Sequence, residues 1–95
     1  MAAGLKFEWD PAKAAINASK HGVSFMEATS VFGDLLSLTI PDPEHSQAET
    51  RYLLIGRTHR NRLVVVAHTE REDQIRIISA RLPTPKEKRS YEQET

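Results

Sequence analysis

The sequence contains no cysteine, and this absence excludes both a disulfide scaffold and a thiolate zinc site. It also lacks any run of about 18 apolar residues, so nothing in it predicts a membrane-spanning helix. Its 95 residues are enough for one compact core and too few for two, so we expect a single domain over residues 1–95. These features together favour a soluble, cytoplasmic protein.

The formal net charge is zero, but the two halves of the chain have opposite signs. Residues 1–50 carry 3 Lys and 7 acidic residues, a balance of −4, whereas residues 51–95 carry 10 Lys or Arg and 6 acidic residues, a balance of +4. Nucleic acid responds to the local density of basic groups, so the second half is a candidate for phosphate binding. The alternative is a set of solvated charges scattered over two faces.

The first third of the chain predicts a short strand and two helices. Polar and apolar residues alternate over residues 6–9, as in a half-buried strand. A first helix is bounded by an N-cap at Asp10 and a left-handed C-cap at Gly22. A second begins at Ser24, where Ser24 and Glu27 predict a reciprocal capping box, and it ends at Gly33-Asp34. Its apolar stripe consists of Phe25, Ala28, Thr29 and Phe32.

The rest of the chain predicts a sheet and one further helix. Short polar turns separate runs rich in β-branched and aromatic residues, which predict an antiparallel meander of strands 35–40, 52–58, 63–70 and 74–81. Residues 63–67 are apolar on both faces, so we expect helices over one face and another cover, such as a second copy in a homo-oligomer, over part of the other. The fold class is therefore α+β.

A helix is predicted after Thr84, because Thr84, Pro85 and Glu87 combine an N-cap, a first-position proline and a capping-box glutamate. From there to Gln93 the only apolar side chain is that of Tyr91. A helix that buries so little is held weakly, so we expect this segment to be the movable part of the molecule.

No familiar catalytic motif is present, since the chain lacks a phosphate-binding glycine loop, a paired His-Glu helix and a nucleophile elbow. The four histidines have spacings that match no compact ligand pattern: His21, His45, His59 and His68. We therefore expect neither a metal site nor a cofactor.

Basic residues are concentrated near the ends of the predicted strands, in the set Arg57, Arg60, Arg62, Arg71, Arg76 and Arg81, followed by Lys86, Lys88 and Arg89. RNA cleavage without a metal needs a base for the 2′-hydroxyl proton, cations that stabilise the phosphorane, and a donor for the leaving oxygen. Arg71 and Arg81 carry planar forks that suit phosphate oxygens, so we expect both at one edge of the sheet. The alternative is surface salt bridges with Glu70, Glu72 or Asp73.

Three further residues are candidates for the same site. Alternation places His68 and Glu70 on one face of their strand, where either could act as the base. The alternative for His68 is a satisfied structural histidine, and Glu70 belongs to a charged turn. Tyr91 either anchors the last helix or presents its hydroxyl to the phosphate, and we take it as a site residue.

Several stretches resemble the family of BrnT-like bacterial toxins. The most specific are FEWD at residues 7–10, KHGVSF at 20–25 and IRIISAR at 75–81. The other matching positions are Lys13, Asn17, Ala28, Val31, Phe32, Asp34, 49–52, Ile55, Gly56, 63–66, 68–71, Glu87 and Tyr91. The resemblance thus covers nearly the whole chain.

This resemblance implies a RelE-like fold and a metal-independent endoribonuclease that halts translation. It also implies neutralisation by a DNA-binding BrnA-type antitoxin, with operator DNA bound only through the complex. Arg81, Tyr91, Arg71 and Lys20 match basic or site positions of the family. The site residues that we predict are therefore Arg81, Tyr91, Arg71, Glu70 and His68 for catalysis, and Lys20, Arg62, Lys86 and Arg89 for RNA binding.

Two function classes remain open. One is an active ribonuclease toxin. The other is a catalytically weak binding module that acts mainly as half of an autorepressing toxin–antitoxin complex. Direct DNA binding by this chain alone is disfavoured, because no helix shows the basic face of a recognition helix.

Overall fold

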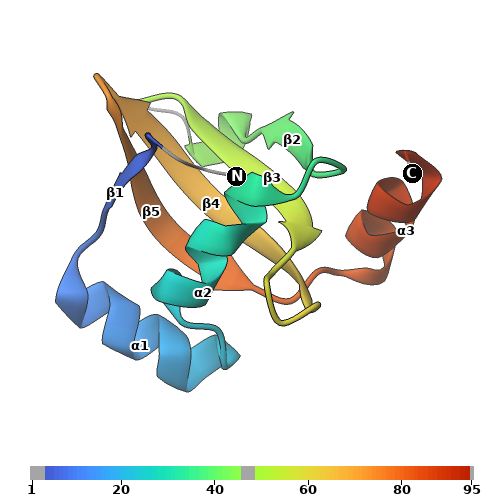
Figure 1. Cartoon of the computed structure of the whole chain (residues 1–95), viewed down its shortest axis with the longest axis horizontal. Helices are drawn as coiled ribbons and strands as arrows, with labels where there is room; N and C mark the ends of the chain where they lie inside the picture. Colours follow the sequence, from blue (N-terminus) through green and yellow to red (C-terminus); the bar gives the residue numbers. More distant parts are fainter. Residues whose placement is uncertain (1–3, 46–48, 95) are drawn as a thin grey trace.

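The structure is a computed structural model that describes residues 4–45 and 49–94. Its elements, shown in Figure 1, are β1 (Lys6–Glu8), α1 (Pro11–His21), α2 (Phe25–Thr29), the 3-10 turn η1 (Ser30–Gly33), β2 (Leu38–Pro41), the 3-10 turn η2 (Pro43–His45), β3 (Arg51–Arg57), β4 (Leu63–Arg71), β5 (Gln74–Arg81) and α3 (Pro85–Glu94). Within the described residues, no helix is long and apolar enough to cross a membrane.

The strands form one sheet in the order β1-β5-β4-β3-β2. The pairs β2–β3, β3–β4 and β4–β5 are antiparallel, whereas β1 lies parallel to β5 and extends the sheet beyond the meander. The α+β class is therefore confirmed. The strand predicted from residue 35 begins only at Leu38, because Asp34 accepts a hydrogen bond from the backbone N–H of Leu36 and holds a turn in which Leu35 is exposed.

The helix α1 has the two ends that its sequence predicts. The Asp10 carboxylate accepts hydrogen bonds from the N–H groups of Ala12 and Lys13, and Gly22 ends the helix at a φ of 70°. Asn17 is buried on its inner side. The Asn17 amide donates to the carbonyls of Val23 and Ala80 at 2.9 and 2.8 Å and accepts from the Ala80 N–H at 3.1 Å.

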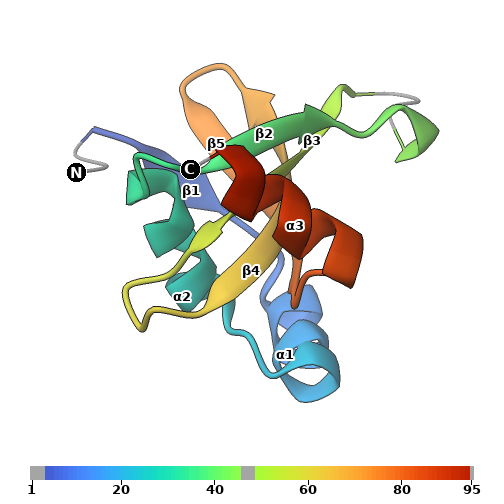
Figure 2. The same cartoon turned by 90° about the vertical axis from the view of Figure 1, so that its right-hand side faces the viewer.

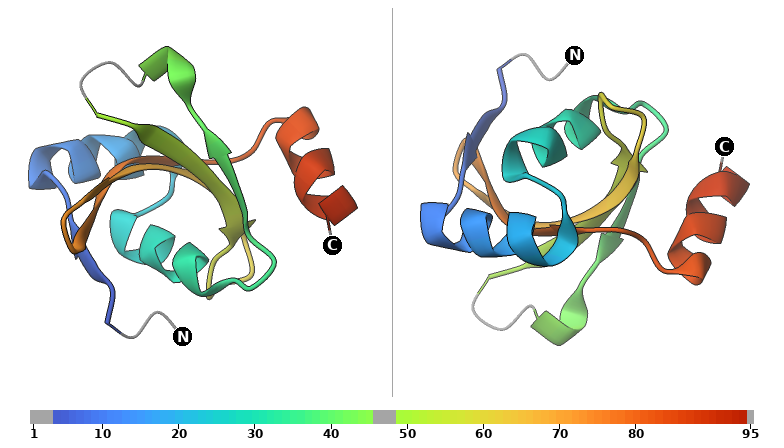
Figure 3. Two further views of the ribbon diagram at one scale, coloured as in Figure 1. Left: turned by 90° about the horizontal axis from the view of Figure 1, so that it is seen from above. Right: turned by 90° about the horizontal axis from the view of Figure 1, so that it is seen from below.

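One face of the sheet carries the larger core. Figure 3 shows α2 on one side of the sheet and α3 on the other. The buried residues of this core, which come from the segment around α2 and from β3, β4 and β5, are Val23, Phe25, Ala28, Val31, Leu54, Val64, Val66, Ile77 and Ala80. We call this side of the sheet the core face.

Glu27 does not close the capping box that the sequence predicts for α2. The Ser24 hydroxyl accepts from the Glu27 N–H at 3.0 Å, as expected. The Glu27 carboxylate, however, turns inward, where it receives hydrogen bonds from Arg62 at 2.6 and 2.9 Å and from the Thr58 hydroxyl at 2.8 Å. Glu27 binds these distant groups in place of its helix end because it is only 4% exposed, and Arg62 and Thr58 supply a positive charge and a hydroxyl to the buried carboxylate.

The opposite face, which we call the back face, is covered in part by α3. Tyr91 is 5% exposed and packs with Ile55 and Val65. The capping box of Thr84 and Glu87 is formed in both directions, at 2.9 and 3.2 Å. In Figure 2 the helix lies in front of the sheet. Tyr91 is the only buried residue among the described residues of α3, so the expectation of a weakly held helix stays a prediction.

The two-sided burial of β4 needs no second copy of the chain. Val64, Val65, Val66, Ala67 and His68 are all buried within this chain. The segment around α2 packs against the core-face residues of β4, while the back-face residue Val65 packs with Tyr91 of α3. The sequence led us to expect a partner over part of the second face of this strand. At Val65 that position is occupied by α3 of the same chain.

Replacing Glu27 with Gln should destabilise the fold in a pH-dependent way. The hydrogen bonds that Glu27 accepts from Arg62, which have the largest effect, and from Thr58 lower the pKa of Glu27 from 4.5 to about 2. The carboxylate therefore stabilises the folded state fully above about pH 4.5, and this contribution is lost as the pH falls towards 2. We expect Glu27→Gln to lower the free energy of unfolding by about 1–3 kcal/mol at pH 7, measured by urea denaturation.

Glu70→Gln, at an exposed position, is the matched control and should leave the stability unchanged. The difference between wild type and Glu27→Gln should shrink between pH 4.5 and pH 2. An equal difference at pH 7 and pH 2.5 would contradict the assignment of the stabilisation to the charged carboxylate.

Candidate functional site

The two arginines predicted to share a site lie at opposite ends of the same strand pair. Arg81 on β5 is opposite Val65, near the start of β4, whereas Arg71 is the last residue of β4 and is opposite Gln74. Six residues of β4 separate the two positions, which corresponds to about 20 Å along the strand. The expectation that these arginines gather at one edge of the sheet is therefore wrong.

Arg81 and Tyr91 each bind an acidic partner beside α3. Arg81 donates to both carboxylate oxygens of Glu87 at 2.7 and 2.9 Å, and this pairing lowers the pKa of Glu87 to about 2. The Tyr91 hydroxyl donates to Asp34 Oδ2 at 2.8 Å, and Arg57 lies 5.9 Å from the centre of the Tyr91 ring. In this structure Tyr91 is the anchor of α3, one of the two roles that the sequence left open.

His68 and Glu70 lie on the core face, opposite the side of the sheet that carries Arg71. His68 is 3% exposed, and its ring packs between those of Phe32 and Tyr52 at 5.0 and 5.7 Å. Burial lowers the pKa of His68 below its ordinary value. The ring therefore has no route to a phosphate bound on the back face.

The four predicted RNA-binding residues are spread over the molecule. Lys20 lines a pocket between α1 and β5, and Lys86 and Arg89 are exposed on α3. Arg62 is committed to Glu27 and to the carbonyl of Gly22 at 3.0 Å. Of these four residues only Lys20 lines one of the two pockets described below, and the roles of all four in RNA binding stay predictions.

A cavity of about 350 Å³ gathers basic residues on the back face, at the end of the sheet away from α3. We call it the basic pocket. Its walls come from α1, η2, the start of β3, the end of β4 and the middle of β5. The lining residues are Lys13, His45, Glu49, Arg51, Thr69, Arg71, Arg76 and Ile78.

The floor of the basic pocket is a row of side chains that crosses β3, β4 and β5 in register, and Glu8 of β1 continues the row beyond the pocket. Glu8 of β1 pairs with Arg76 of β5, Arg76 with Thr69 of β4, and Thr69 with Arg51 of β3. Neighbours in such a row have their Cβ atoms about 5 Å apart. Three strands thus contribute side chains to one site.

A β-bulge in β5 decides which residues reach this pocket. Ala67 pairs with Ser79 and His68 with Ile77, so Ile78 is the extra residue between them. The bulge lets Ile77 and Ala80 both face the core, three residues apart, and it leaves Arg76 and Ser79 on the back face. Strict alternation would place Arg76 and Ser79 on opposite faces.

Two carboxylates hold the pocket's arginines in place. Glu49 accepts both a 2.6 and a 2.8 Å hydrogen bond from the guanidinium of Arg71. Glu8 lies 3.6 Å from Arg71 and 3.5 Å from Arg76. The hydrogen bonds from Arg71 hold the pKa of Glu49 below its ordinary value. With Lys13 and Arg51 as the other cations, four positive charges face two negative ones.

His45 is the one imidazole that lines the basic pocket. Its Nδ1 lies 3.1 and 3.2 Å from the two carboxylate oxygens of Asp42. The backbone N–H of Asp42 in turn donates to the carbonyl of Arg51, which ties the η2 turn to β3. With Nδ1 at Asp42, proton exchange with a ligand falls to Nε2.

Thr69 also lines the basic pocket and has a hydroxyl without a hydrogen-bond partner among the described residues. Its side chain is 1% exposed, and among the described residues its Oγ1 has no hydrogen-bond partner. A buried hydroxyl without a partner costs folding free energy, and most buried polar groups in folded proteins have one. This atom could donate to an oxygen of a ligand in the pocket.

The sequence interpretation missed most of this site. Arg71 was predicted, but Lys13, His45, Arg51 and Arg76 were not assigned to it. The spacing Asp42-x-x-His45 just before a strand beginning with Arg51 was the available signal. Within residues 4–45 and 49–94, no three His, Asp or Glu side chains lie together as a metal site would need.

Two comparisons with known proteins match the chain. The family model described as the ribonuclease toxin BrnT of type II toxin–antitoxin systems matches residues 9–87. No curated protein sequence matches. A crystal structure of the Brucella abortus ribonuclease toxin BrnT superposes with a TM-score of 0.66 and 23% identity, over 84% of this chain and 97% of that one. At this identity, the superposition establishes the shared fold.

Removing the Thr69 hydroxyl should leave the fold as stable or make it more so. Thr69→Val replaces an unpartnered buried hydroxyl with a methyl group, and we expect the free energy of unfolding to stay constant or rise by about 1 kcal/mol. Thr58→Val is the matched control, since it removes a hydroxyl that donates to Glu27, and it should cost about 1–3 kcal/mol. Equal losses in both variants, measured in urea, would show that Thr69 is bonded in solution.

Proposed function

The chain belongs to the family of BrnT ribonuclease toxins of type II toxin–antitoxin systems, and from this premise we propose that it is a metal-independent endoribonuclease whose cleavage site is the basic pocket. The single observation that carries this proposal is the convergence of four cations and one imidazole on one cavity. Arginine forks suit phosphate oxygens, and RNA offers a chain of them. The cations here are guanidinium and ammonium groups, which can stabilise a phosphorane without a metal.

The reaction is an internal transfer at phosphorus. The 2′-oxygen of the substrate forms a bond to phosphorus while the bond to the 5′-oxygen breaks, giving a 2′,3′-cyclic phosphate and a 5′-hydroxyl. One proton leaves the 2′-hydroxyl and one is delivered to the 5′-oxygen, so the step needs no further reactant. Arg51, Arg71 and Arg76 would stabilise the extra negative charge on the phosphoryl oxygens.

His45 is our choice for the base. Its competitor in the pocket, Glu49, accepts two hydrogen bonds from Arg71 that keep its pKa low, which makes it a poor proton acceptor. Imidazole is the side chain most often used for general acid–base catalysis, and the contact with Asp42 fixes the orientation of the His45 ring. The Thr69 hydroxyl would donate to a phosphoryl oxygen.

The type II family implies an antitoxin partner. We propose that this partner is of the DNA-binding BrnA type, that it covers the basic pocket and the exposed side of α3, and that operator DNA is bound only through the complex. Cleavage of RNA would inhibit translation. The RelE-like relationship is part of the same proposal, supported by the antiparallel meander with helices against its core face.

A second candidate function is a catalytically weak binding module. It is favoured by the ion pairs of the arginines with carboxylates. These pairs are Arg71 with Glu49, Arg76 with Glu8, and Arg81 with Glu87. A phosphate must displace these carboxylates or share the arginines with them, and this competition weakens phosphate binding. This candidate predicts an antitoxin complex without measurable cleavage.

The test is RNA cleavage by the purified chain in the presence of a chelator. We expect the wild type to release fragments with 2′,3′-cyclic phosphate ends, and His45→Ala to be slower by about 100-fold or more. His59→Ala is the matched control, because His59 lies in the β3–β4 turn outside the basic pocket, and it should cleave like the wild type.

Arg81→Ala and Tyr91→Phe separate this site from the one near α3. Full activity of His45→Ala together with loss of activity in these two variants would move cleavage to the α3 end. Absence of cleavage by the folded, antitoxin-free wild type, together with antitoxin binding in a separate assay, would favour the binding module.

A further inference from the structure

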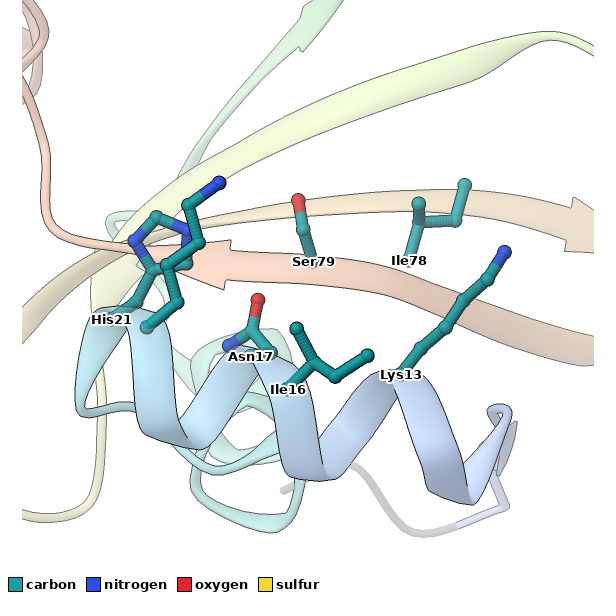
Figure 4. A pocket seen from close by; sticks show the side chains of 7 residues that line it. Lys13, Ile16, Asn17, His21, Ile78 and Ser79 are labelled. Carbon is teal, nitrogen blue, oxygen red and sulfur yellow. The ribbon is translucent and has the colours of Figure 1, made fainter.

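The basic pocket continues into a second cavity between α1 and β5, of about 220 Å³. Lys13 and Ile78 line both cavities, so the two share a wall. Figure 4 shows side chains of α1 and of β5 around the second cavity, with Lys13 near Ile78 at one end and His21 at the other. The complete lining is Lys13, Ile16, Asn17, Lys20, His21, Ile78 and Ser79.

We infer that this α1–β5 pocket binds the nucleotide next to the pair that flanks the scissile phosphate, with its base against Ile16 and Ile78 and its phosphates near Lys13 and Lys20. The inference rests on the proposed function, since it names a second substrate subsite beside the basic pocket. Its volume lies below the roughly 300–1,000 Å³ of cavities for drug-sized ligands, which suits one nucleobase.

Ile16 is the first reason. Its side chain is 65% exposed on a helix that is otherwise mainly small and polar, and it contributes nothing to either hydrophobic core. It lies instead on the wall of the α1–β5 pocket, where Ile78, the bulged residue of β5, is also found. Two apolar side chains on one small cavity fit the flat face of a base.

Charge is the second reason. Lys13 and Lys20 are seven residues apart on α1, so they project from the same side of the helix about 10 Å apart along its axis. This spacing lets the two ammonium groups contact phosphates on either side of one nucleotide. Neither lysine has an acidic partner within 4.0 Å among the described ion pairs.

Asn17 lines the α1–β5 pocket but is not available to form hydrogen bonds with a base. Its amide is used up by the backbone of Val23 and Ala80, so it forms the rigid back wall rather than a contact. The polar groups that remain in the lining are the hydroxyl of Ser79 and the ring of His21. Both can donate or accept, so the pocket tolerates more than one base.

The experiment measures binding of single-stranded oligonucleotides that carry a 2′-deoxy group at the scissile position and so cannot be cleaved. A dinucleotide fills the basic pocket alone, and a tetranucleotide also reaches the α1–β5 pocket. We expect Ile16→Ser to weaken tetranucleotide binding about tenfold, the loss of one base contact, and to leave dinucleotide binding unchanged.

Lys20→Met should weaken the same complex and lower the slope of log Kd against log salt by about 0.7, the value for one phosphate contact on a single strand. Met26→Ser, at a residue 67% exposed on α2, and Lys88→Met on α3 are the matched controls and should behave as the wild type. Circular dichroism checks that every variant is folded.

Equal binding of the tetranucleotide by wild type, Ile16→Ser and Lys20→Met would overturn this inference while leaving cleavage at the basic pocket intact. If Ile16→Ser loses binding to the antitoxin but keeps that of the tetranucleotide, the pocket belongs to the protein partner and the inference is again overturned. A wild type that binds neither oligonucleotide would remove the proposed function together with the subsite.

Discussion

The amide of Asn17 is the contact on which the arrangement of this molecule depends. The strand β1 pairs with β5 only at residues 74–76, so the rest of that edge presents backbone groups that need partners. Asn17 supplies them at Ala80 with one donor and one acceptor, in the way that a neighbouring strand would, and its second donor bonds Val23. The helix α1 is thereby fixed along the edge of the sheet, and with it the lysines that it carries towards the back face.

The local signals in the sequence were sufficient for the helices and for the strands of the meander, because caps, turns and alternation act within a few residues. They failed where a distant group competed. Glu27 has the spacing of a capping box, yet a buried carboxylate gains more from Arg62 and Thr58 than from one backbone N–H. Tyr91 is the one apolar residue of a polar helix in the sequence. The structure shows that its ring packs with Ile55 and Val65 and that its hydroxyl donates to Asp34.

The candidate site was harder to predict than the fold because it is assembled across strands. Register decides that Arg51, Thr69 and Arg76 stand in one row, and register is not visible in a single strand. The extra residue Ile78 then reverses the face of everything after it relative to simple alternation. A reader of the sequence therefore sees abundant arginine but assigns it to the strand ends, where Arg71 and Arg81 turn out to be far apart.

The paired carboxylates of the basic pocket have a consequence for selectivity. Glu49 and Glu8 act as built-in counterions, so the guanidinium groups of Arg71 and Arg76 are already neutralised when no ligand is present. An incoming anion that offers a single weak contact gains little by replacing a bidentate carboxylate. A phosphodiester chain that engages several cations at once would gain from each of them, so such a pocket would favour a polyanion over single small anions.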